Sequence, residues 1–342
     1  MAKKKKLRWL LWTVLLVVLV GLLGAYKVLG PNTGSLSKGE YLYIRTGSDY
    51  KAVLDSLKEG GYLKETWSFD LIAQRADYPS KVKAGKYHIK PGMSNFGIIR
   101  MLRSGRQEAV KLVINKLRTK QDFINLITKE LEANADSLNY YLADSGFITD
   151  YELDTSSLMS LIIPDTYEFY WNTSASKVLL KIGKNYHTFW NEERKQIALN
   201  KKLTIKQISI IASIVEEETN KNDEKGNIAS VYINRLQKGI PLQADPTVKF
   251  AIGDFTIRRI TGQHLMYNSP YNTYMYSSLP PGPICTPSKK TIDAVLNAPD
   301  TKFLFFCAKD DFSGYHVFAT TLAEHQKNAR AYQKALNERG IH

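Results

Sequence analysis

Residues 204–220, TIKQISIIASIVEEETN, carry the pattern that decides the fold of the larger part of this chain. Thr204 is followed three residues later by Gln207, a capping box that predicts the start of a helix. At about 100° per residue, one side of this helix is apolar and consists of Ile205, Ile208, Ile211, Ala212 and Val215. The opposite side is polar and consists of Lys206, Ser209, Ser213 and Glu217. The sequence therefore predicts an amphipathic helix that packs one face against a core.

Glu218 departs from this pattern, because it lies on the apolar side, three residues after Val215 and seven after Ile211. An inward carboxyl group is desolvated, which disfavours its charged form and raises its pKa. A protonated acid of this kind suits glycosidic bond cleavage, in which the leaving oxygen must receive a proton. The helical wheel leaves two readings open: a catalytic acid, or a glutamate paired with an arginine such as Arg235. Glu217 is expected to be a solvated surface charge.

Three loops with polar, aromatic and proline residues come after a further predicted helix at residues 227–237. In the first, PLQADPTV at 241–248, Asp245 precedes a proline and is therefore expected to have an extended or turn geometry. The side chains in this loop that suit sugar hydroxyl groups or amides are Gln243, Asp245 and Thr247. SPYNTY at 269–274 offers two rings on which a sugar can stack, those of Tyr271 and Tyr274. LPPGPI at 279–284 predicts a rigid, extended wall.

Length and composition limit the class of protein. A chain of 342 residues is long enough for two folded domains, and 44% hydrophobic with 23% charged residues excludes a mostly disordered one. The net charge of +14 suits a polyanionic partner: nucleic acid, anionic lipid or a cell-wall polymer. Cys285 and Cys307 are too few for a disulfide scaffold, and their spacing leaves pairing open. The sequence contains no Cys-x-x-Cys pair, phosphate-binding loop or nucleophile turn.

The N-terminus predicts a membrane anchor. Residues 1–8 form a basic tail with Lys3 to Lys6 and Arg8, and residues 9–29 form an apolar stretch. A helix needs about 20 apolar residues to cross a bilayer. The basic side faces the cytoplasm, so the bulk of the chain is expected outside it, which disfavours nucleic acid as a partner. A cleaved signal peptide is the competing reading, but its apolar core is usually shorter and ends in a small-x-small cleavage site.

Beyond the anchor, the sequence predicts an α+β protein with two parts. Residues 30–40 form a linker, and residues 41–107 form a small module of alternating strands and helices that is LysM-like by analogy. Residues 108–342 form a larger α+β domain. Within it we expect one long helix over 175–199, a hairpin formed by 303–308 and 315–318, and a closing helix over 321–338.

Five motifs follow one another in the larger domain. They are IASIVEEET at 211–219, ASVYINRL at 229–236, LQADPTV at 242–248, YNTY at 271–274 and LPPG at 279–282. Together they resemble the signature of the endolytic murein transglycosylases, the YceG-like family. The resemblance extends from the anchor to the closing helix and is strongest between Pro164 and His325. It implies that Glu218, the second glutamate of a Glu-x-Glu-Thr motif, is the catalytic residue.

The resemblance also implies a lytic reaction. Ordinary glycosidases use two carboxylates; here Glu218 alone would protonate the glycosidic oxygen and then deprotonate the muramyl C6 hydroxyl, which gives a 1,6-anhydromuramyl end without water. The candidates for holding the sugar are Gln243, Asp245, Thr247, Asn272, Tyr274 and His316. No metal or organic cofactor is implied.

The partners expected on this reading are peptidoglycan strands, the membrane and peptidoglycan synthases, beside which the enzyme would terminate nascent strands. The remaining alternatives are a hydrolytic muramidase and a non-catalytic, membrane-anchored scaffold that binds peptidoglycan.

Overall fold

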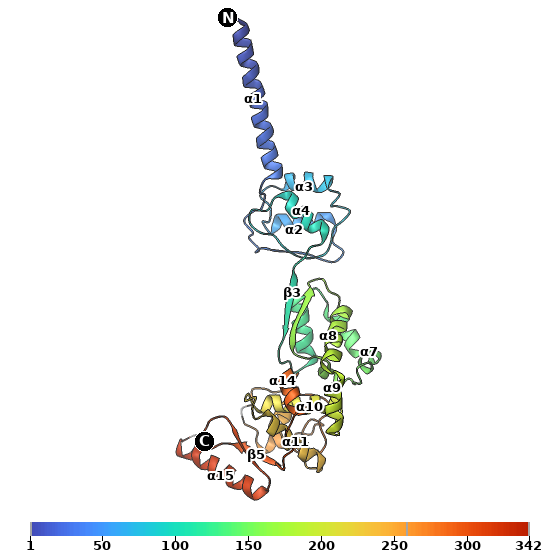
Figure 1. Cartoon of the computed structure of the whole chain (residues 1–342), viewed down its shortest axis with the longest axis vertical. Helices are drawn as coiled ribbons and strands as arrows, with labels where there is room; N and C mark the ends of the chain where they lie inside the picture. The colour runs from blue at the N-terminus through green and yellow to red at the C-terminus, as the bar shows by residue number, and fades with distance from the viewer. Residues whose placement is uncertain (1, 258, 341–342) are drawn as a thin grey trace. The chain divides into compact units, whose positions relative to one another are not determined.

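The structure is a computed structural model that describes the backbone of residues 2–257 and 259–340, and their side chains except those of residues 2–7 and 145. The basic side chains Lys3 to Lys6 of the expected cytoplasmic tail lie outside this described set. The chain forms two compact units (Figure 1). Unit 1 comprises Met1–Lys111, Glu130–Glu132 and Glu168–Ser174; unit 2 comprises Leu112–Lys129, Ala133–Tyr167 and Ala175–His342.

The elements alternate between helices and short strands. In chain order they are α1 (Ala2–Leu29), β1 (Tyr41–Ile44), α2 (Tyr50–Glu59), α3 (Thr66–Arg75), β2 (Gly85–His88), α4 (Asn95–Ser104), β3 (Ala109–Ile114), α5 (Lys120–Glu130), α6 (Ala135–Ala143), α7 (Ser145–Thr149), η1 (Leu158–Leu161), β4 (Asp165–Tyr170), α8 (Ala175–Phe189), α9 (Glu192–Asn200), α10 (Ile205–Glu218), α11 (Lys225–Gln237), α12 (Asp245–Ile252), α13 (Gly262–Leu265), α14 (Lys289–Leu296), β5 (Phe305–Ala308), β6 (His316–Ala319) and α15 (Leu322–Glu338). The α+β class predicted from the sequence is confirmed.

The predicted N-terminal helix is also confirmed. Residues Arg8–Leu29 of α1 form a helix that is long and apolar enough to cross a membrane, and none of it is buried in the protein. A helix that is apolar all round and not buried in protein exposes the surface expected of a span surrounded by lipid.

Unit 1 contains the small module predicted for residues 41–107. Strands β1 and β2 pair antiparallel, with Tyr41 opposite His88 and Ile44 opposite Gly85. Helices α2 and α4 begin at side-chain caps, Asp49 and Ser94, each of which accepts from a backbone N–H. The core that these elements share consists of Leu42, Ile44, Val53, Leu57, Tyr62, Phe69, Ala73, Tyr78, Tyr87, Ile89, Ile98, Ile99, Met101 and Leu102. The likeness of this module to LysM domains stays a prediction.

Helix α10 is the centre of unit 2, where α9, α11, α12 and α14 pack around it. The capping box of Thr204 and Gln207 forms as predicted. However, every residue from Ile208 to Val215 is buried, so the expected solvent-exposed polar face is wrong. Ser213 is buried because residues 284–285 cover it: its hydroxyl oxygen accepts from the backbone N–H of Ile284 at 3.0 Å.

Two further expectations can be compared with the structure. The single helix over 175–199 is wrong, because Asn191 caps a new helix by accepting from the backbone N–H of Arg194 and so separates α8 from α9.

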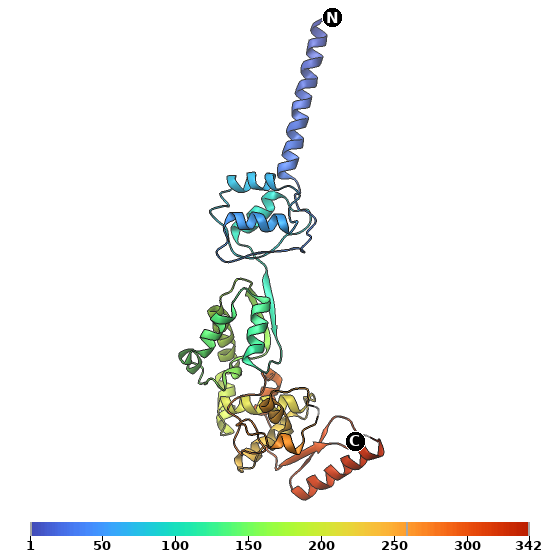
Figure 2. The same ribbon diagram turned by 180° about the vertical axis from the view of Figure 1, so that it is seen from behind.

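The C-terminal hairpin is confirmed: β5 and β6 pair antiparallel, with Phe305 opposite Ala319. The closing helix α15 lies along this hairpin (Figure 2).

Candidate active site

Three consecutive glutamates end α10, and each meets a different environment. Glu218 is the last residue of the helix, and Thr219 after it has an extended backbone. The Thr219 hydroxyl donates to Glu224 at 2.6 Å, which fixes the turn into α11. Because successive residues of a helix point about 100° apart, Glu216, Glu217 and Glu218 face different neighbours.

Glu218 lines a cleft, and its side chain is half-buried there. The Tyr232 hydroxyl of α11 donates to Glu218 Oε1 at 2.6 Å. Among the described residues, no cation lies within ion-pair distance of this carboxyl group, and Oε2 has no hydrogen-bond partner. Burial raises the pKa of Glu218 to about 7; the bond from Tyr232 opposes the rise, and the negative charge of Asp245 adds to it. Glu218 is therefore half protonated near neutral pH.

The two neighbouring glutamates contact cations or hydroxyl groups. Burial by itself would raise the pKa of Glu216, but a hydroxyl bond from Thr291 and the ammonium group of Lys225, 3.1 Å away, bring the pKa below its ordinary value. Glu217 pairs with Lys116 and Arg118, each at 3.0 Å, and only 16% of its side chain is exposed. The expectation that Glu217 is a solvated surface charge is therefore wrong, because two basic residues some 100 positions earlier in the chain cover it.

The cleft at Glu218 has a volume of about 360 Å³. Such a volume is in the range of small-molecule sites, about 300–1,000 Å³. Its walls come from α10, α11, α12, the C-terminal hairpin and α15, and they consist of Glu218, Tyr232, Arg235, Leu242, Gln243, Asp245, Tyr274, Phe305, Phe306, Leu322 and His325. Three of the substrate-binding candidates are thus brought together with Glu218: Gln243, Asp245 and Tyr274.

These three candidates are linked to the cleft by hydrogen bonds. The Tyr274 hydroxyl donates to Asp245 Oδ1 at 2.6 Å. Gln243 accepts a hydrogen bond from the Arg235 guanidinium group, and its backbone is in the left-handed region with φ of 54°. The expected extended or turn geometry at Asp245 is replaced by a helix start: Asp245 begins α12, and Pro246 lies in the first turn, where its missing N–H costs nothing.

Three other candidates lie outside the cleft walls. Thr247 is fully buried and donates to the Ala244 carbonyl at 2.7 Å. Asn272 is also fully buried and donates to the carbonyl groups of Leu265 and Tyr267, each at 2.9 Å. Both side chains therefore hold loops next to the cleft.

His316 and Tyr271 also bond or pack elsewhere. His316 Nδ1 lies 3.0 Å from Glu224 Oε1, and its backbone N–H donates to the same carboxyl group at 2.9 Å. Tyr271, which was expected to stack on sugar, packs against Phe250 with ring centroids 4.8 Å apart.

Several residues that line the cleft were not predicted from the sequence to belong to the site. Tyr232 and Arg235 lie three residues apart on α11, so one face of this helix supplies both the hydrogen bond to Glu218 and a buried cation. The same helical-wheel argument that identified Glu218 could have identified this pair. Arg235 donates to the carbonyl groups of Pro241 and Leu304 and to Gln243, and not to Glu218. His325 and Phe306 come from the distant C-terminal elements and gave no sequence signal.

The described residues form neither a metal-binding cluster nor a disulfide between the two cysteines. Within residues 2–257 and 259–340, no group of three or more His, Cys, Asp or Glu side chains is arranged to hold a metal ion. Cys285 is a buried free thiol, and Cys307 is a partly exposed one. The sequence left their pairing open, and in this structure they are separate.

Fold and site together define a class: an α+β protein whose polar cleft holds a half-buried carboxylic acid, Glu218, that has no ion-pair partner among the described residues and is suited to acid–base chemistry. The chain belongs to the YceG-like family, whose family model matches residues 42–331. It is 30% identical over 312 residues to the endolytic murein transglycosylase of Bacillus subtilis (strain 168), covering 86% of this chain and 85% of that one.

Two other similar proteins extend the comparison. The endolytic murein transglycosylase of Streptococcus pneumoniae serotype 2 (strain D39 / NCTC 7466) is 24% identical over 319 residues; the alignment spans 83% of this chain but 57% of the longer pneumococcal one. The crystal structure of a YceG-like protein from Listeria monocytogenes has a TM-score of 0.57 and 26% identity, and covers 84% of this chain and 98% of that chain.

Proposed function

We propose that this chain is an endolytic murein transglycosylase in which Glu218 is the catalytic acid and base. The observation that carries the proposal is the state of Glu218: a carboxyl group in a cleft, bonded to the neutral Tyr232, without a cation and with a pKa of about 7. The names of the similar proteins from Bacillus subtilis and Streptococcus pneumoniae supply the substrate, murein.

The proposed reaction uses this one carboxyl group twice. Protonated Glu218 gives its proton to the oxygen between N-acetylmuramic acid and N-acetylglucosamine as the bond from that oxygen to the muramyl C1 breaks. The resulting carboxylate then takes the proton of the muramyl C6 hydroxyl, whose oxygen bonds to C1. The product is a 1,6-anhydromuramyl end, Glu218 is again protonated, and no water is consumed.

The cleft walls suggest which side chains hold the sugar. We assign direct contact to Gln243, Asp245 and Tyr274, because they line the cleft with Glu218. The Asp245 carboxylate near the reaction centre would favour the positive charge that develops on the sugar ring. Thr247 and Asn272 are assigned an indirect role, because their bonds fix the loops that carry these three residues.

The location proposed for this reaction is the outer surface of the cytoplasmic membrane. Helix α1 would cross the bilayer once with its N-terminus inside, as the basic residues before the apolar stretch indicate. An enzyme held there meets glycan strands as they emerge. We therefore propose that it terminates nascent strands beside the peptidoglycan synthases.

Mass spectrometry of purified glycan strands digested by the full-length protein tests this function. Wild type is expected to release anhydromuramyl products, and Glu218→Gln is expected to be slower by about 10²- to 10⁴-fold, since general acid–base catalysis contributes that much. Glu217→Gln is the matched control, one residue away on the same helix end, and should act at a rate within a few-fold of wild type.

The other outcomes discriminate between the alternatives. Reducing ends in place of anhydromuramyl ends would identify a hydrolytic muramidase. An equal rate for wild type and Glu218→Gln would remove Glu218 from the reaction. No product from any variant, with binding to strands retained, would favour the non-catalytic scaffold.

A further inference from the structure

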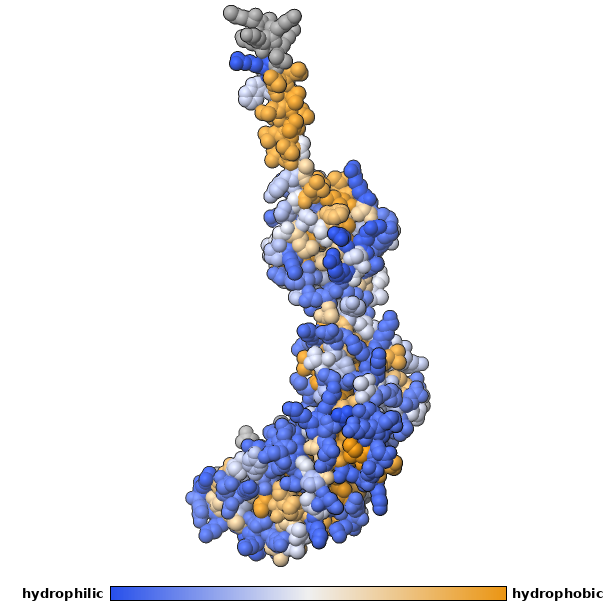
Figure 3. Space-filling view, viewed as in Figure 1, coloured by the Kyte–Doolittle hydropathy of each residue, from blue (hydrophilic) through white to orange (hydrophobic). Residues whose placement is uncertain are grey.

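One face of unit 1, next to the end of α1, combines exposed apolar and basic side chains. Helices α3 and α4 pack against each other, and both contact α1. Glu65, just before α3, pairs with Lys27 of α1, and Asn95 at the start of α4 donates to the Val28 carbonyl at 3.3 Å. The first turns of α3 and α4 therefore lie at the end of the apolar helix, where Figure 3 shows an apolar patch.

The exposed side chains change in the same order along both helices. On α3, Trp67 is 57% exposed and Leu71 40% exposed, and Arg75 follows one turn later. On α4, Phe96 is 59% exposed, and Arg100 follows one turn later. Each helix thus presents apolar groups near α1 and a cation farther from it. An interfacial helix buries aromatic and aliphatic groups in the lipid and leaves its cations among the phosphates.

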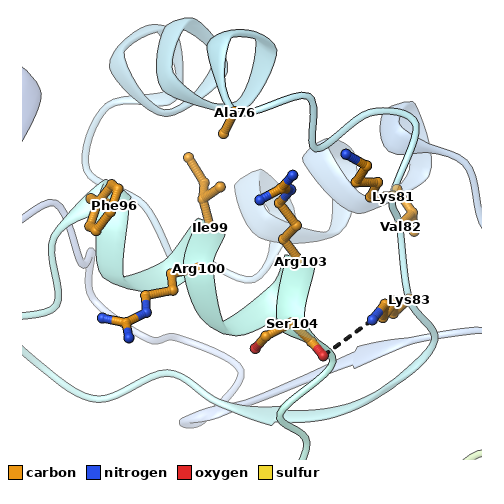
Figure 4. Close-up of a pocket in the computed structure, with 9 residues that line it drawn as sticks. All are labelled: Ala76, Lys81, Val82, Lys83, Phe96, Ile99, Arg100, Arg103 and Ser104. Carbon is orange, nitrogen blue, oxygen red and sulfur yellow. Dashed lines mark hydrogen bonds between the residues drawn. The ribbon is translucent and has the colours of Figure 1, made fainter.

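A cavity of about 440 Å³ opens on the same face, between α4 and the chain that follows α3. Its walls are Ala76, Lys81, Val82, Lys83, Phe96, Ile99, Arg100, Arg103 and Ser104. Figure 4 shows Ala76, Ile99 and Arg103 around a common space.

The charges of this cavity are predominantly positive. Lys81 is paired with Asp77 at 2.7 Å, and Lys83 donates to the Ser104 carbonyl at 3.2 Å. Among the described residues, neither Arg100 nor Arg103 lies within ion-pair distance of a carboxylate. The cavity therefore has an apolar floor and two arginines available to an anion.

We propose that this face, formed by Trp67, Leu71 and Phe96 with the cavity at Arg100 and Arg103, binds anionic phospholipid at the surface of the membrane that α1 spans. The inference rests on the anchoring proposed above. Two observations identify lipid as the ligand of this face. The face begins where the apolar helix α1 ends, and its arginines, which have no ion-pair partner among the described residues, match the charge of lipid phosphates. The module is thereby held against the bilayer by a second contact in addition to the helix.

The test uses the full-length protein in nanodiscs whose acyl chains carry bromine, which quenches tryptophan fluorescence at short range. One set of discs contains phosphatidylglycerol and the other only phosphatidylcholine. The contribution of Trp67 is the difference between wild type and Trp67→Phe. We expect Trp67 to be quenched in the phosphatidylglycerol discs. Each basic residue near an anionic surface changes the ratio of docked to undocked module about fivefold, so Arg100→Glu with Arg103→Glu should lower it by about 25-fold or more.

Two controls make the outcomes distinguishable. Trp9 and Trp12 of α1 report insertion of the anchor in the same sample, and Lys51→Glu with Lys58→Glu reverses two exposed charges on α2, which does not line the cavity. Quenching of Trp67 that is lost only in the arginine variant supports the proposal. Quenched Trp9 and Trp12 with an unquenched Trp67 overturns it and leaves the anchor intact. If all three are unquenched, the anchor itself fails.

A glycan ligand is the competing occupant. If wild type binds purified sacculi, the arginine variant does not, and Trp67 is unquenched in phosphatidylglycerol discs, the face is a glycan surface and the lipid proposal is wrong.

Discussion

The two sides of the end of α10 place half-buried carboxyl groups in opposite environments. On one side, Glu216 meets Lys225 of α11 together with hydroxyl groups of Thr291 and Ser288. On the other side, Glu218 meets only Tyr232, which lies seven residues after Lys225 on the same helix. Both groups are desolvated by the same two helices, yet their pKa values move in opposite directions. The difference shows that burial raises the pKa of a carboxyl group here unless hydroxyl groups and a cation, such as Thr291 and Lys225 at Glu216, outweigh it.

Removal of the cation on the Glu216 side should give the largest change in stability. Lys225→Met leaves the Glu216 carboxylate buried without its partner, which typically costs about 3–5 kcal/mol. Hydrogen exchange of the α10 backbone amides measures the loss. Lys238→Met, at the exposed end of the same helix, is the control and should change little. If the α10 amides of both variants exchange at the wild-type rate, the proposed contrast between Glu216 and Glu218 is wrong.

A double variant sharpens this first result. Glu216→Gln in addition to Lys225→Met leaves no ionised group at this place, so part of the lost stability should return. If the double variant loses as much stability as the two single variants lose together, the two side chains act independently.

The Glu218 side should behave in the opposite way, since Glu218→Gln is expected to stabilise the fold. The pKa of Glu218 rises from its ordinary value of 4.5 to about 7 on folding, so ionising it costs the folded state about 3 kcal/mol. The folded state binds the proton more tightly, and wild type therefore loses stability as the pH rises from 4.5 through 7. The gain of Glu218→Gln over wild type should be near zero at pH 4 and about 3 kcal/mol at pH 9. Hydrogen exchange over this range measures it; a constant difference would contradict the pKa.

Loss of the hydrogen bond that the Tyr232 hydroxyl donates should have a smaller effect, a shift in the pKa of Glu218. This hydroxyl stabilises the charged form of Glu218 and lowers its pKa, so Tyr232→Phe should raise that pKa above 7, by roughly one pH unit. The activity of wild type should fall above pH 7 as the acid ionises, and in the variant this fall should move to higher pH. The pH profile of kcat/KM with soluble glycan strands tests this. An unmoved alkaline limb would show that Tyr232 does not tune the acid.

The smallest effect is expected between these two sides, at Glu217. Its partners Lys116 and Arg118 are about one third exposed, and ion pairs of that kind contribute up to about 1 kcal/mol. Glu217→Gln should therefore alter the α10 exchange rates slightly. A loss as large as that of Lys225→Met would mean that Glu217 shares the structural role of Glu216.

Local signals in the sequence were sufficient to predict helix α10 and the inward position of Glu218. The capping box at Thr204 and the helical wheel of α10 depend only on neighbouring residues, and these two signals predict the start of the helix and place Glu218 on its apolar side; the catalytic role came from the resemblance. The α+β class and the hairpin β5–β6 also follow from local alternation and turn residues. The break at Asn191 was missed, although an asparagine is a common helix cap.

The cleft as a whole depends on contacts between distant segments, which periodicity does not contain. Glu217 was misread because Lys116 and Arg118 lie far away in the sequence. Polar loop residues such as Thr247 and Asn272 looked like ligands because a buried loop tether and a sugar contact use the same side chains. Tyr232 looked like an ordinary core residue of α11, because its hydroxyl partner belongs to another helix.

The position of Glu218 as the last residue of α10 adds a further electrostatic consequence. The final turn of a helix has unpaired carbonyl groups that give it about half a negative charge, which favours a lysine or arginine there and disfavours a carboxylate. In this protein a proton on the side chain itself makes Glu218 neutral and so removes the repulsion. In addition to burial, the polarity of its own helix thus helps Glu218 to keep that proton, whereas the same residue in the first turn of a helix would favour ionisation.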